Sequence, residues 1–215
     1  MERPTRTQPA RRGRAGKLED ARDDARDCTR CDLYKHATQT VFGDGPARAR
    51  LMFVGEQPGD EEDKTGTPFV GPAGRLLRAA FAEAGIDEQD VYITNAVKHF
   101  KFEERGKRRI HKRPNTAEIN ACRFWLEVEI GAVQPEILVA LGATAAASIL
   151  GKGVSVLRDR GKLLPSPFPQ VTHVTVTTHP AAILRAPDST ARAEARSRFV
   201  EDLRAIKKLL AKASH

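Results

Sequence analysis

The sequence predicts an α/β protein with three layers, α/β/α, around a central parallel sheet of four strands. Four short apolar runs, rich in β-branched residues, have the length of strands: LMFVG (51–55), VYITNAV (91–97), EILVALG (136–142) and VTVTTHP (174–180). Such runs are typical of strands that are buried on both faces. Helical patterns separate them, and alternating strands and helices indicate a parallel sheet covered by helices.

Helices are expected between and around these strands. Residues 73–84, 116–131 and 143–150 have helical patterns, and NTAE before the second resembles a capping arrangement. A closing helix over 190–212 is indicated by apolar residues at helical spacing. A short polar helix over 18–27 is expected to lead into the first cysteines.

Composition and charge divide the chain into a tail and one domain. With 215 residues, 40% hydrophobic and 30% charged, the sequence is that of an ordinary soluble domain, and wholesale disorder is excluded. Residues 1–17 hold six Lys or Arg and one Glu, a large share of the net charge of +8. We expect residues 1–17 to form a disordered basic tail and residues 18–215 to form the domain. The tail either attracts polyanions or is simply solvated.

The apolar segments are too short for a membrane protein. No apolar run approaches the length that spans a bilayer, and the N-terminus lacks the apolar segment of a secretory signal. We therefore expect a cytoplasmic protein without a membrane partner, and a monomer as the simplest state.

Three cysteines occur, Cys28, Cys31 and Cys122. An odd number in a chain without an export signal does not favour a disulfide framework. The Cys-x-x-Cys pair with a distant third thiol is typical of a metal or cluster site that lacks one ligand, and His99 is a candidate for it. Zinc and an iron–sulfur cluster both remain open, as does a set of free thiols beside a surface histidine.

The loops that follow parallel strands gather at one edge of the sheet, where ligands bind. The first of them contains Glu56, Gln57 and Phe69, followed by GPAG (71–74) at the start of a helix. Glycines such as Gly55 permit close approach of a ligand, and a helix N-terminus favours an anion. The same glycines also fit an ordinary tight loop.

Single polar residues end two of the apolar strands. Asn95 offers both a donor and an acceptor to the edge of a base, and His179 offers a donor to an oxygen that gains negative charge. A capping asparagine and a satisfied core histidine are the structural alternatives. Because Asn95 and His179 are expected at the same edge of the sheet as Glu56, a functional site is favoured.

The stretch GKRRIHKRP (106–114) places His111 among five cations. Such a run is most often a phosphate-binding loop, in which the imidazole is one more donor. The neighbouring cations are expected to lower the pKa of His111 and to favour its neutral, nucleophilic form. The stretch alone leaves both roles open.

Several motifs together resemble the family 4 uracil-DNA glycosylases, over roughly residues 20–210. They are GEQPGDEEDKTGTPFVGPAG, YITNAVK, the Cys-x-x-Cys pair, ACRFWL and HPAAILR. The KRRIH insert and the glutamine of GEQPG are similar, more narrowly, to the UdgX group, whose members become covalently joined to the abasic site. The resemblance implies excision of uracil from DNA, with single strands preferred, and linkage of His111 to C1′ of the abasic site.

The resemblance also implies roles for individual residues. Phe69 would stack on the flipped uracil, Asn95 would read its polar edge, and His179 would stabilise the departing anion. The family's motif commonly continues His-Pro-Ser, whereas this chain has Ala181, so a contact from that serine is in doubt.

The loop that would hold the base and sugar contributes Gly55, Glu56 and Gln57, with Glu56 assisting catalysis. The DNA phosphates would be held by the insert and by the GPAG turn, through Lys107, Arg108, Arg109, Gly71 and Gly74.

For the metal site, the resemblance implies a 4Fe-4S cluster, with zinc as the alternative. Its ligands would be Cys28, Cys31 and Cys122, with His99 where family 4 enzymes carry a cysteine. The cluster would pin the N-terminal segment and the second loop to the domain.

Two other functions compete with this interpretation. One is a conventional family 4 glycosylase with multiple turnovers, in which His111 only touches phosphate. The other is a non-catalytic zinc or cluster module that binds DNA. A nucleotide-binding signalling domain is disfavoured, because no phosphate-loop lysine motif occurs.

Overall fold

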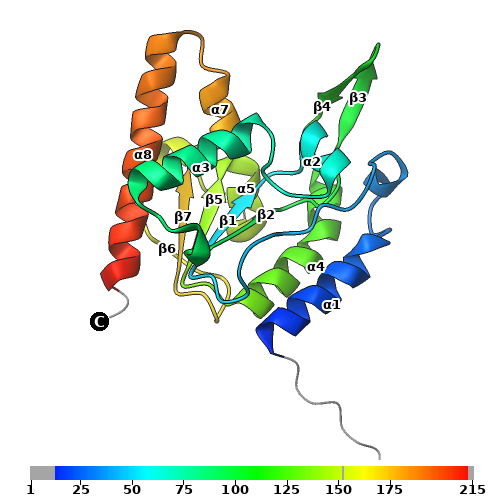
Figure 1. The fold of residues 1–215 in the computed structure, drawn as a ribbon, viewed down its shortest axis with the longest axis horizontal. Helices are drawn as coiled ribbons and strands as arrows, with labels where there is room; N and C mark the ends of the chain where they lie inside the picture. Colours follow the sequence, from blue (N-terminus) through cyan, green and yellow to red (C-terminus); the bar gives the residue numbers. More distant parts are fainter. Residues whose placement is uncertain (1–12, 152, 213–215) are drawn as a thin grey trace, which may run out of the picture.

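The computed structural model describes residues 13–151 and 153–212 and confirms the predicted α/β fold with helices on both sides of a mostly parallel sheet (Figure 1). The sheet has the order β2–β1–β5–β7–β6. Its four parallel strands are those expected: β1 (Leu51–Gly55), β2 (Val91–Asn95), β5 (Ile137–Leu141) and β7 (His173–Thr177). The prediction missed a fifth, antiparallel strand, because β6 (Leu164–Pro165) has only two residues and no readable pattern.

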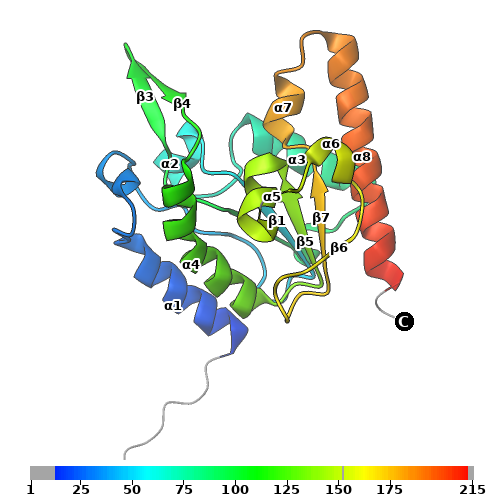
Figure 2. The same cartoon turned by 180° about the vertical axis from the view of Figure 1, so that it is seen from behind.

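Each face of the sheet packs on its own apolar core, because successive strand residues point to opposite faces. Phe53 belongs to the core beneath α3 (Pro72–Ala84) and α8 (Ser189–Lys212), whereas its neighbour Met52 belongs to the core on the other face. Figures 1 and 2 show the two helical layers from opposite sides. The second layer consists of α1 (Arg14–Arg26), α4 (Thr116–Val133) and α5 (Gly142–Leu150).

Short elements complete the connections. They are η1 (Asp32–Lys35), α2 (Asp60–Thr65), η2 (Glu88–Asp90), α6 (Val156–Asp159) and α7 (Pro180–Leu184). None of them was expected from the sequence, since three to six residues are too few to show a helical period.

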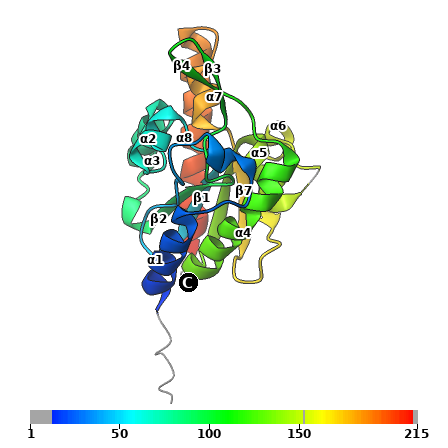
Figure 3. The same ribbon diagram turned by 90° about the vertical axis from the view of Figure 1, so that its right-hand side faces the viewer.

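The N-terminal helix begins earlier than expected. Residues 1–12 of the predicted tail lie outside the described residues, but α1 starts at Arg14. Arg14 donates a hydrogen bond to the carbonyl of Val133 at the end of α4, 3.1 Å away, and Leu18 is buried between the helices. Figure 3 shows α1 alongside α4. The boundary at residue 17 is therefore wrong for residues 14–17, which belong to the domain.

The capping arrangement predicted before α4 is confirmed. The side chain of Asn115 accepts a hydrogen bond from the backbone of Glu118, and the Glu118 carboxylate accepts one from the backbone of Asn115 at 2.7 Å. These bonds satisfy two of the backbone donors that a helix start leaves open. They also fix the point at which the chain leaves the basic stretch.

Residues 98–115, whose sequence shows no regular pattern, contain a β-hairpin. Strands β3 (Phe102–Arg105) and β4 (Arg108–His111) pair antiparallel, with Phe102 opposite His111. Gly106 permits the tight turn, because its φ of 60° lies in the left-handed region. The segment FEERGKRRIH is mostly charged and lacks the apolar alternation that predicts a strand. The hairpin projects beyond the edge of the main sheet (Figure 1).

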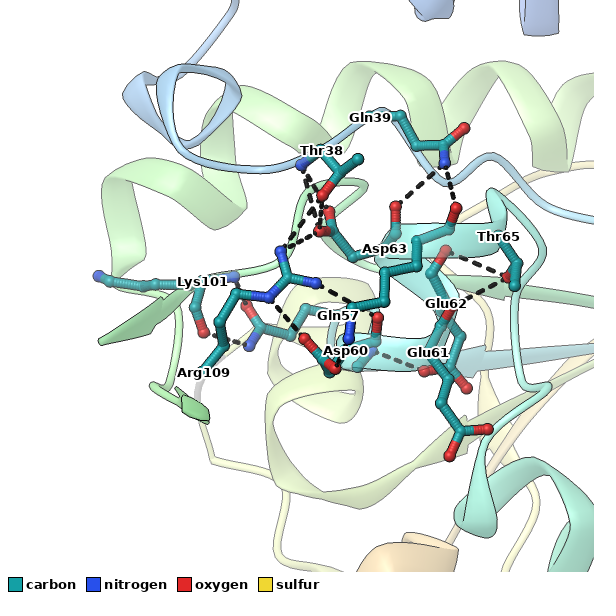
Figure 4. Close-up of polar contacts among 12 residues, drawn as sticks. Thr38, Gln39, Gln57, Asp60, Glu61, Glu62, Asp63, Thr65, Lys101 and Arg109 are labelled. Carbon is teal, nitrogen blue, oxygen red and sulfur yellow. Dashed lines mark hydrogen bonds and ion pairs between the residues drawn. The ribbon is translucent and has the colours of Figure 1, made fainter. Parts of the chain in front are cut away.

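Arg109 fastens this hairpin to α2 (Figure 4). Its Nε lies 2.5 Å from Asp60 Oδ1 and its Nη1 lies 2.6 Å from Asp63 Oδ2, and Asp63 is fully buried. The guanidinium also lies over the ring of Phe102, 5.0 Å from its centroid. The expectation that Arg109 holds a DNA phosphate is therefore corrected, because these contacts commit its donors within the protein.

We predict that Arg109→Ala destabilises the protein by about 3 kcal/mol, because the change removes the cation from the buried Asp63 carboxylate. Amide hydrogen exchange in residues 102–111 should accelerate most. The matched control is Arg108→Ala, an exposed neighbour that should change the free energy of unfolding by less than about 0.5 kcal/mol. Equal unfolding and exchange in both variants would remove the fastening role of Arg109.

Candidate active site

A cavity of about 850 Å³ opens at the carboxyl ends of the parallel strands. Five residues from separate parts of the chain line it together: Glu56, Phe69, Asn95, His111 and His179. The structure thus brings the principal predicted site residues to one place, as the topology of a parallel sheet requires.

The inner wall of this pocket is crowded. A Cβ atom added at Gly55 would lie 2.3 Å from Asn95 Oδ1 and 2.7 Å from the Phe69 ring, so only glycine fits there. Phe69 itself has a φ of 55°, a conformation that non-glycine residues rarely adopt. Its ring is buried. Close packing therefore fixes the aromatic side chain before any ligand arrives.

The GPAG turn supports this wall. A Cβ at Gly74 would lie 1.7 Å from the carbonyl oxygen of Phe69, so this glycine lets α3 pack against the Phe69 backbone. The backbone N–H of Gly71 donates to Glu62 Oε1 at 2.8 Å. The expected phosphate contacts of Gly71 and Gly74 are thus corrected. Gly74 is buried against the Phe69 backbone, and the N–H of Gly71 already donates to the Glu62 carboxylate.

Asn95 presents an unsatisfied acceptor. Among the described residues, its Oδ1 and Nδ1 of His99 are the two buried side-chain atoms that lack a hydrogen-bond partner. A buried polar atom without a partner is costly and is rare in folded proteins. Because Asn95 also lines the pocket, its Oδ1 is suited to accept a hydrogen bond from a ligand.

His179 is a neutral donor in the same pocket. Burial, together with the positive charges of the nearby Arg185 and His111, lowers its pKa to about 4. Its Nδ1 accepts a hydrogen bond from the backbone N–H of Ala181 at 3.1 Å, so the ring proton resides on Nε2. This contact uses only the backbone of Ala181, so the residue type there does not affect it.

One oxygen of the Glu56 carboxylate accepts a hydrogen bond from the protein, and the other faces His111. Its Oε2 accepts a short hydrogen bond from the hydroxyl of Thr144, and Arg113 Nε donates to that hydroxyl oxygen at 3.1 Å. Its Oε1 faces His111 Nε2 at 3.7 Å. The sequence reasoning missed Thr144, although it is the one polar residue in ATAAA after β5, and missed the role of Arg113.

His111 ends β4 and faces the pocket with half of its side chain exposed. Burial of the ring lowers its pKa below 6.5, Glu56 opposes that shift, and Arg185 adds to it. The sequence reasoning was right about the direction but wrong about the cause, because the pKa is lowered by burial and by a cation of another segment. At neutral pH the imidazole is uncharged.

Gln57 connects the hairpin to the loop after β1 (Figure 4). Its amide donates to the carbonyls of Lys101 and Lys112, at 3.1 and 3.0 Å, and accepts from the N–H of Lys101 at 3.1 Å. These bonds occupy the amide and close the base of the hairpin. Gln57 therefore positions the hairpin, and it also lines the pocket in which a contact with base or sugar is expected.

Two basic residues at the hairpin tip are available to a ligand. Lys107 and Arg108 are exposed, and neither forms an ion pair within residues 13–151 and 153–212. Arg113 and Arg185 add positive charge at the pocket itself. Four acidic residues also line the pocket, Glu56, Asp60, Glu61 and Glu62, and cations of the protein pair with Asp60 and Glu61. The exposed cations of the hairpin tip and the pocket rim suit a polyanionic substrate.

The three cysteines lie near enough to one another to interact electrostatically. Cys28 and Cys122 are buried, each is free, and the charges of Cys28 and Cys31 both act on Cys122. Cys28 Sγ accepts a hydrogen bond from Trp125 Nε1, and Cys122 Sγ accepts one from the backbone N–H of Lys98, each at 3.1 Å. Burial raises the pKa of Cys122 to about 12, so its thiol is protonated in the protein alone. The N–H donors are the contacts that a thiolate bound to a metal or cluster would accept.

His99 lines a cavity of about 260 Å³ together with Cys28. Its Nε2 lies 2.9 Å from the hydroxyl of Thr40, while its Nδ1 is buried without a partner. In the part of the chain that the structure describes, no three His, Cys, Asp or Glu side chains are arranged to hold a single metal ion.

The pocket combines five groups with different chemical roles. It offers an aromatic ring, an unsatisfied acceptor, a neutral donor, a carboxylate and an imidazole. The first three suit a planar heterocycle with a polar edge, and the last two suit a bond cleavage in which positive charge develops.

No helix within the described residues has the length and apolarity to cross a membrane.

Comparison with known proteins identifies the family. The sequence profile of the Uracil DNA glycosylase superfamily matches residues 42–204. A type-4 uracil-DNA glycosylase of Thermotoga maritima is 39% identical over 186 residues, which cover 86% of this chain and 90% of that protein. One from Pyrobaculum aerophilum is 37% identical over 75% of this chain and 82% of that protein. One from Archaeoglobus fulgidus is 33% identical over 91% of this chain and 94% of that protein. The chain therefore belongs to the uracil DNA glycosylase superfamily.

Proposed function

We propose that this protein excises uracil from DNA and that His111 then becomes covalently joined to C1′ of the abasic site. The observation that carries the excision is the buried, unpaired Oδ1 of Asn95 in a pocket with Phe69 and His179. The similarity to proteins named type-4 uracil-DNA glycosylases supports the same activity.

Recognition begins when the uracil leaves the base stack and enters the pocket. Its N3–H donates to Oδ1 of Asn95, and the amide group of Asn95 donates to O4. The ring of Phe69 stacks on the base. Cytosine has no hydrogen at N3 and carries an amino group at C4, so the same asparagine rejects it.

Cleavage breaks the bond between N1 and C1′. The electron pair moves into the uracil ring and the sugar becomes a cation. His179 donates from Nε2 to O2 of the uracil anion, and its low pKa keeps it a neutral donor throughout. The carboxylate of Glu56 stabilises the sugar cation, and Thr144 fixes the orientation of that carboxylate.

Capture of the sugar cation follows from the position of His111. The lone pair of Nε2 forms a bond to C1′, and the Nδ1 proton is then lost to water, so that a neutral, substituted imidazole remains. The lowered pKa of His111 keeps that lone pair free at neutral pH. The hairpin holds the ring beside Glu56, where the sugar cation forms.

The conventional reaction remains the second candidate, because the relatives are named as type-4 enzymes. In that reaction, Glu56 directs a water molecule to C1′ and the protein turns over repeatedly. His111 then only borders the DNA. The two candidates share the base pocket and differ in whether the attacking group is a water molecule or His111.

DNA binding is assigned to the exposed tip of the hairpin. Lys107 and Arg108 contact phosphates, which gives an affinity that falls with salt concentration. We propose that single-stranded DNA is preferred, because no base pair must then be broken before the uracil enters the pocket.

We also propose that Cys28, Cys31, His99 and Cys122 hold a four-iron four-sulfur cluster. The buried thiols, the N–H groups that point at them and the unpaired Nδ1 of His99 fit such a group. A cluster spreads its ligands farther apart than a single ion does. Bound there, it would cross-link the segment after α1 to α4 and to the loop after β2, and it takes no part in the cleavage step.

The test of the covalent step is a denaturing gel of protein incubated with a labelled single-stranded oligonucleotide that contains one uracil. We expect a band that survives heat and detergent, that is absent with a thymine oligonucleotide and that disappears in His111→Ser. His111→Ser should still release uracil, because Glu56, Asn95 and His179 remain. Loss of the band without loss of excision supports the proposal, whereas a band that persists in His111→Ser refutes linkage through this residue.

The pH dependence of crosslinking should reflect the lowered pKa of His111. Protonation removes the lone pair, so the crosslinking rate should fall to half of its value at high pH only below pH 6.5. The measurement is the single-turnover crosslinking rate between pH 5 and pH 8, with uracil release by His111→Ser as the control for excision. A half-point at or above 6.5 would contradict this account of the imidazole.

Cys28→Ala should lose iron, inorganic sulfide and visible absorbance, and should lower the yield of folded protein. His99→Cys is the matched variant, because it supplies the thiolate that the family 4 enzymes have at this position, and it should keep all three signals. Wild-type iron and sulfide in Cys28→Ala would remove that cysteine from the ligand set.

A further inference from the structure

Lys98 and Glu129 form an ion pair in the interior of the protein. Both side chains are 0% exposed, and the Lys98 ammonium lies 2.5 Å from Glu129 Oε2. Removing two charges from water is expensive, and an apolar pair of similar volume is often as stable or more so. Stability alone is therefore a poor explanation for this pair, which suggests a role that depends on its geometry.

Every hydrogen of the ammonium group has an acceptor. Besides Glu129, Lys98 Nζ donates to the hydroxyl of Thr94 and to the main-chain carbonyl of Asn95, both at 2.7 Å. Three donors directed to three acceptors fix the position of the group. Its contact with Asn95 ties it to the residue that carries the unpaired acceptor of the pocket.

Glu129 is held equally firmly from the other side. Its Oε1 accepts hydrogen bonds from the N–H of Gly43 at 2.8 Å, from the hydroxyl of Tyr92 at 3.1 Å and from Thr94 at 3.0 Å. The carboxylate is thus a fixed anchor for Lys98.

The carbonyl of Asn95 needs this donor because of its place in the sheet. Asn95 is the last residue of β2, which is the edge strand. The following N–H groups, of Ala96 and Val97, donate to Gly55 and Glu56 on the inner side. The Asn95 carbonyl points to the outer side, where the N–H groups of Asp44 and Val41 donate to the carbonyls of Ile93 and Lys98 instead. The ammonium supplies the donor for Asn95.

We infer that Lys98, anchored by Glu129, is a positioning residue that fixes the peptide of Asn95 and thereby aims the Asn95 side chain into the pocket. This inference rests on the proposed role of Asn95 in reading the base. The buried ion pair thus positions the residue that recognises the base, and Lys98 itself touches neither base nor sugar. Through its own N–H the same residue contacts Cys122 Sγ, so the base-reading strand and the thiol region meet at Lys98.

The test replaces both charges at once, as Lys98→Met with Glu129→Leu, so that no buried charge is left without its partner. We expect this double variant to fold, with a lower unfolding temperature because Gly43, Tyr92 and the Asn95 carbonyl lose hydrogen-bond partners. It should bind a thymine oligonucleotide with wild-type affinity, because the hairpin tip is unchanged. The single-turnover excision rate should fall on the order of 100-fold, since a small misplacement of a positioning group has that effect.

The same double variant is then measured in the Asn95→Ala background, where a residue that acts only through Asn95 has nothing left to position. We expect no further loss of rate there. A wild-type excision rate in the double variant, or a further loss of the same size in the Asn95→Ala background, overturns the inference. If Asn95→Ala alone excises at the wild-type rate, the proposed base reading fails as well, which separates the two claims.

Two more variants are controls for a general folding defect. Tyr92→Phe removes a hydrogen bond to Glu129 but leaves the hold of Lys98 on Asn95 intact, so its excision rate should match wild type. Arg50→Met with Glu136→Leu removes an ion pair just before the central strands β1 and β5, at the ends opposite the pocket, and should also keep that rate. If the double variant does not fold, Lys98→Gln replaces it, with the same expectation in both backgrounds.

Discussion

The ion pairs of Arg109 with Asp60 and Asp63 determine where His111 lies. Arg109 and His111 are two residues apart on β4, so their side chains leave the strand on the same side. Once the guanidinium is bound to α2, the imidazole is directed at the pocket, beside the free oxygen of Glu56. Gln57 closes the base of the hairpin and limits its tilt. The reactive geometry thus depends on an interaction that involves no substrate.

Burial gives the two pocket histidines their chemical character. It lowers the pKa of both, so each is uncharged at neutral pH, but their surroundings assign them different tasks. His179 is enclosed and receives a backbone hydrogen bond at Nδ1, which leaves Nε2 as a donor. His111 is half exposed on a hairpin and keeps an accessible nitrogen. The unpaired acceptor of Asn95 completes a pocket that is polarised before the base enters.

The sequence was sufficient for the sheet and for the position of the pocket, because long apolar strands and the topology of parallel sheets leave few alternatives. It was insufficient for the hairpin, whose charged residues have no strand pattern, and for Arg109, which seemed to be one more phosphate contact. The phosphate contacts expected of Gly71 and Gly74 were wrong for a similar reason. A glycine indicates that another group approaches the backbone closely, but the sequence does not show whether that group belongs to a ligand or to the protein. Thr144 and Lys98 act through contacts with residues distant in the sequence, Glu56 and Glu129, and neither composition nor spacing reveals those.

The most direct test of the account is the stoichiometry of uracil release with the oligonucleotide in large excess over protein. The account predicts that release stops at one uracil for each protein molecule, and that every protein molecule then carries a DNA strand. Continued release of many uracils for each protein molecule, with the protein free of DNA, would contradict it. Water would then be the attacking group at C1′, and His111 a residue that only borders the DNA.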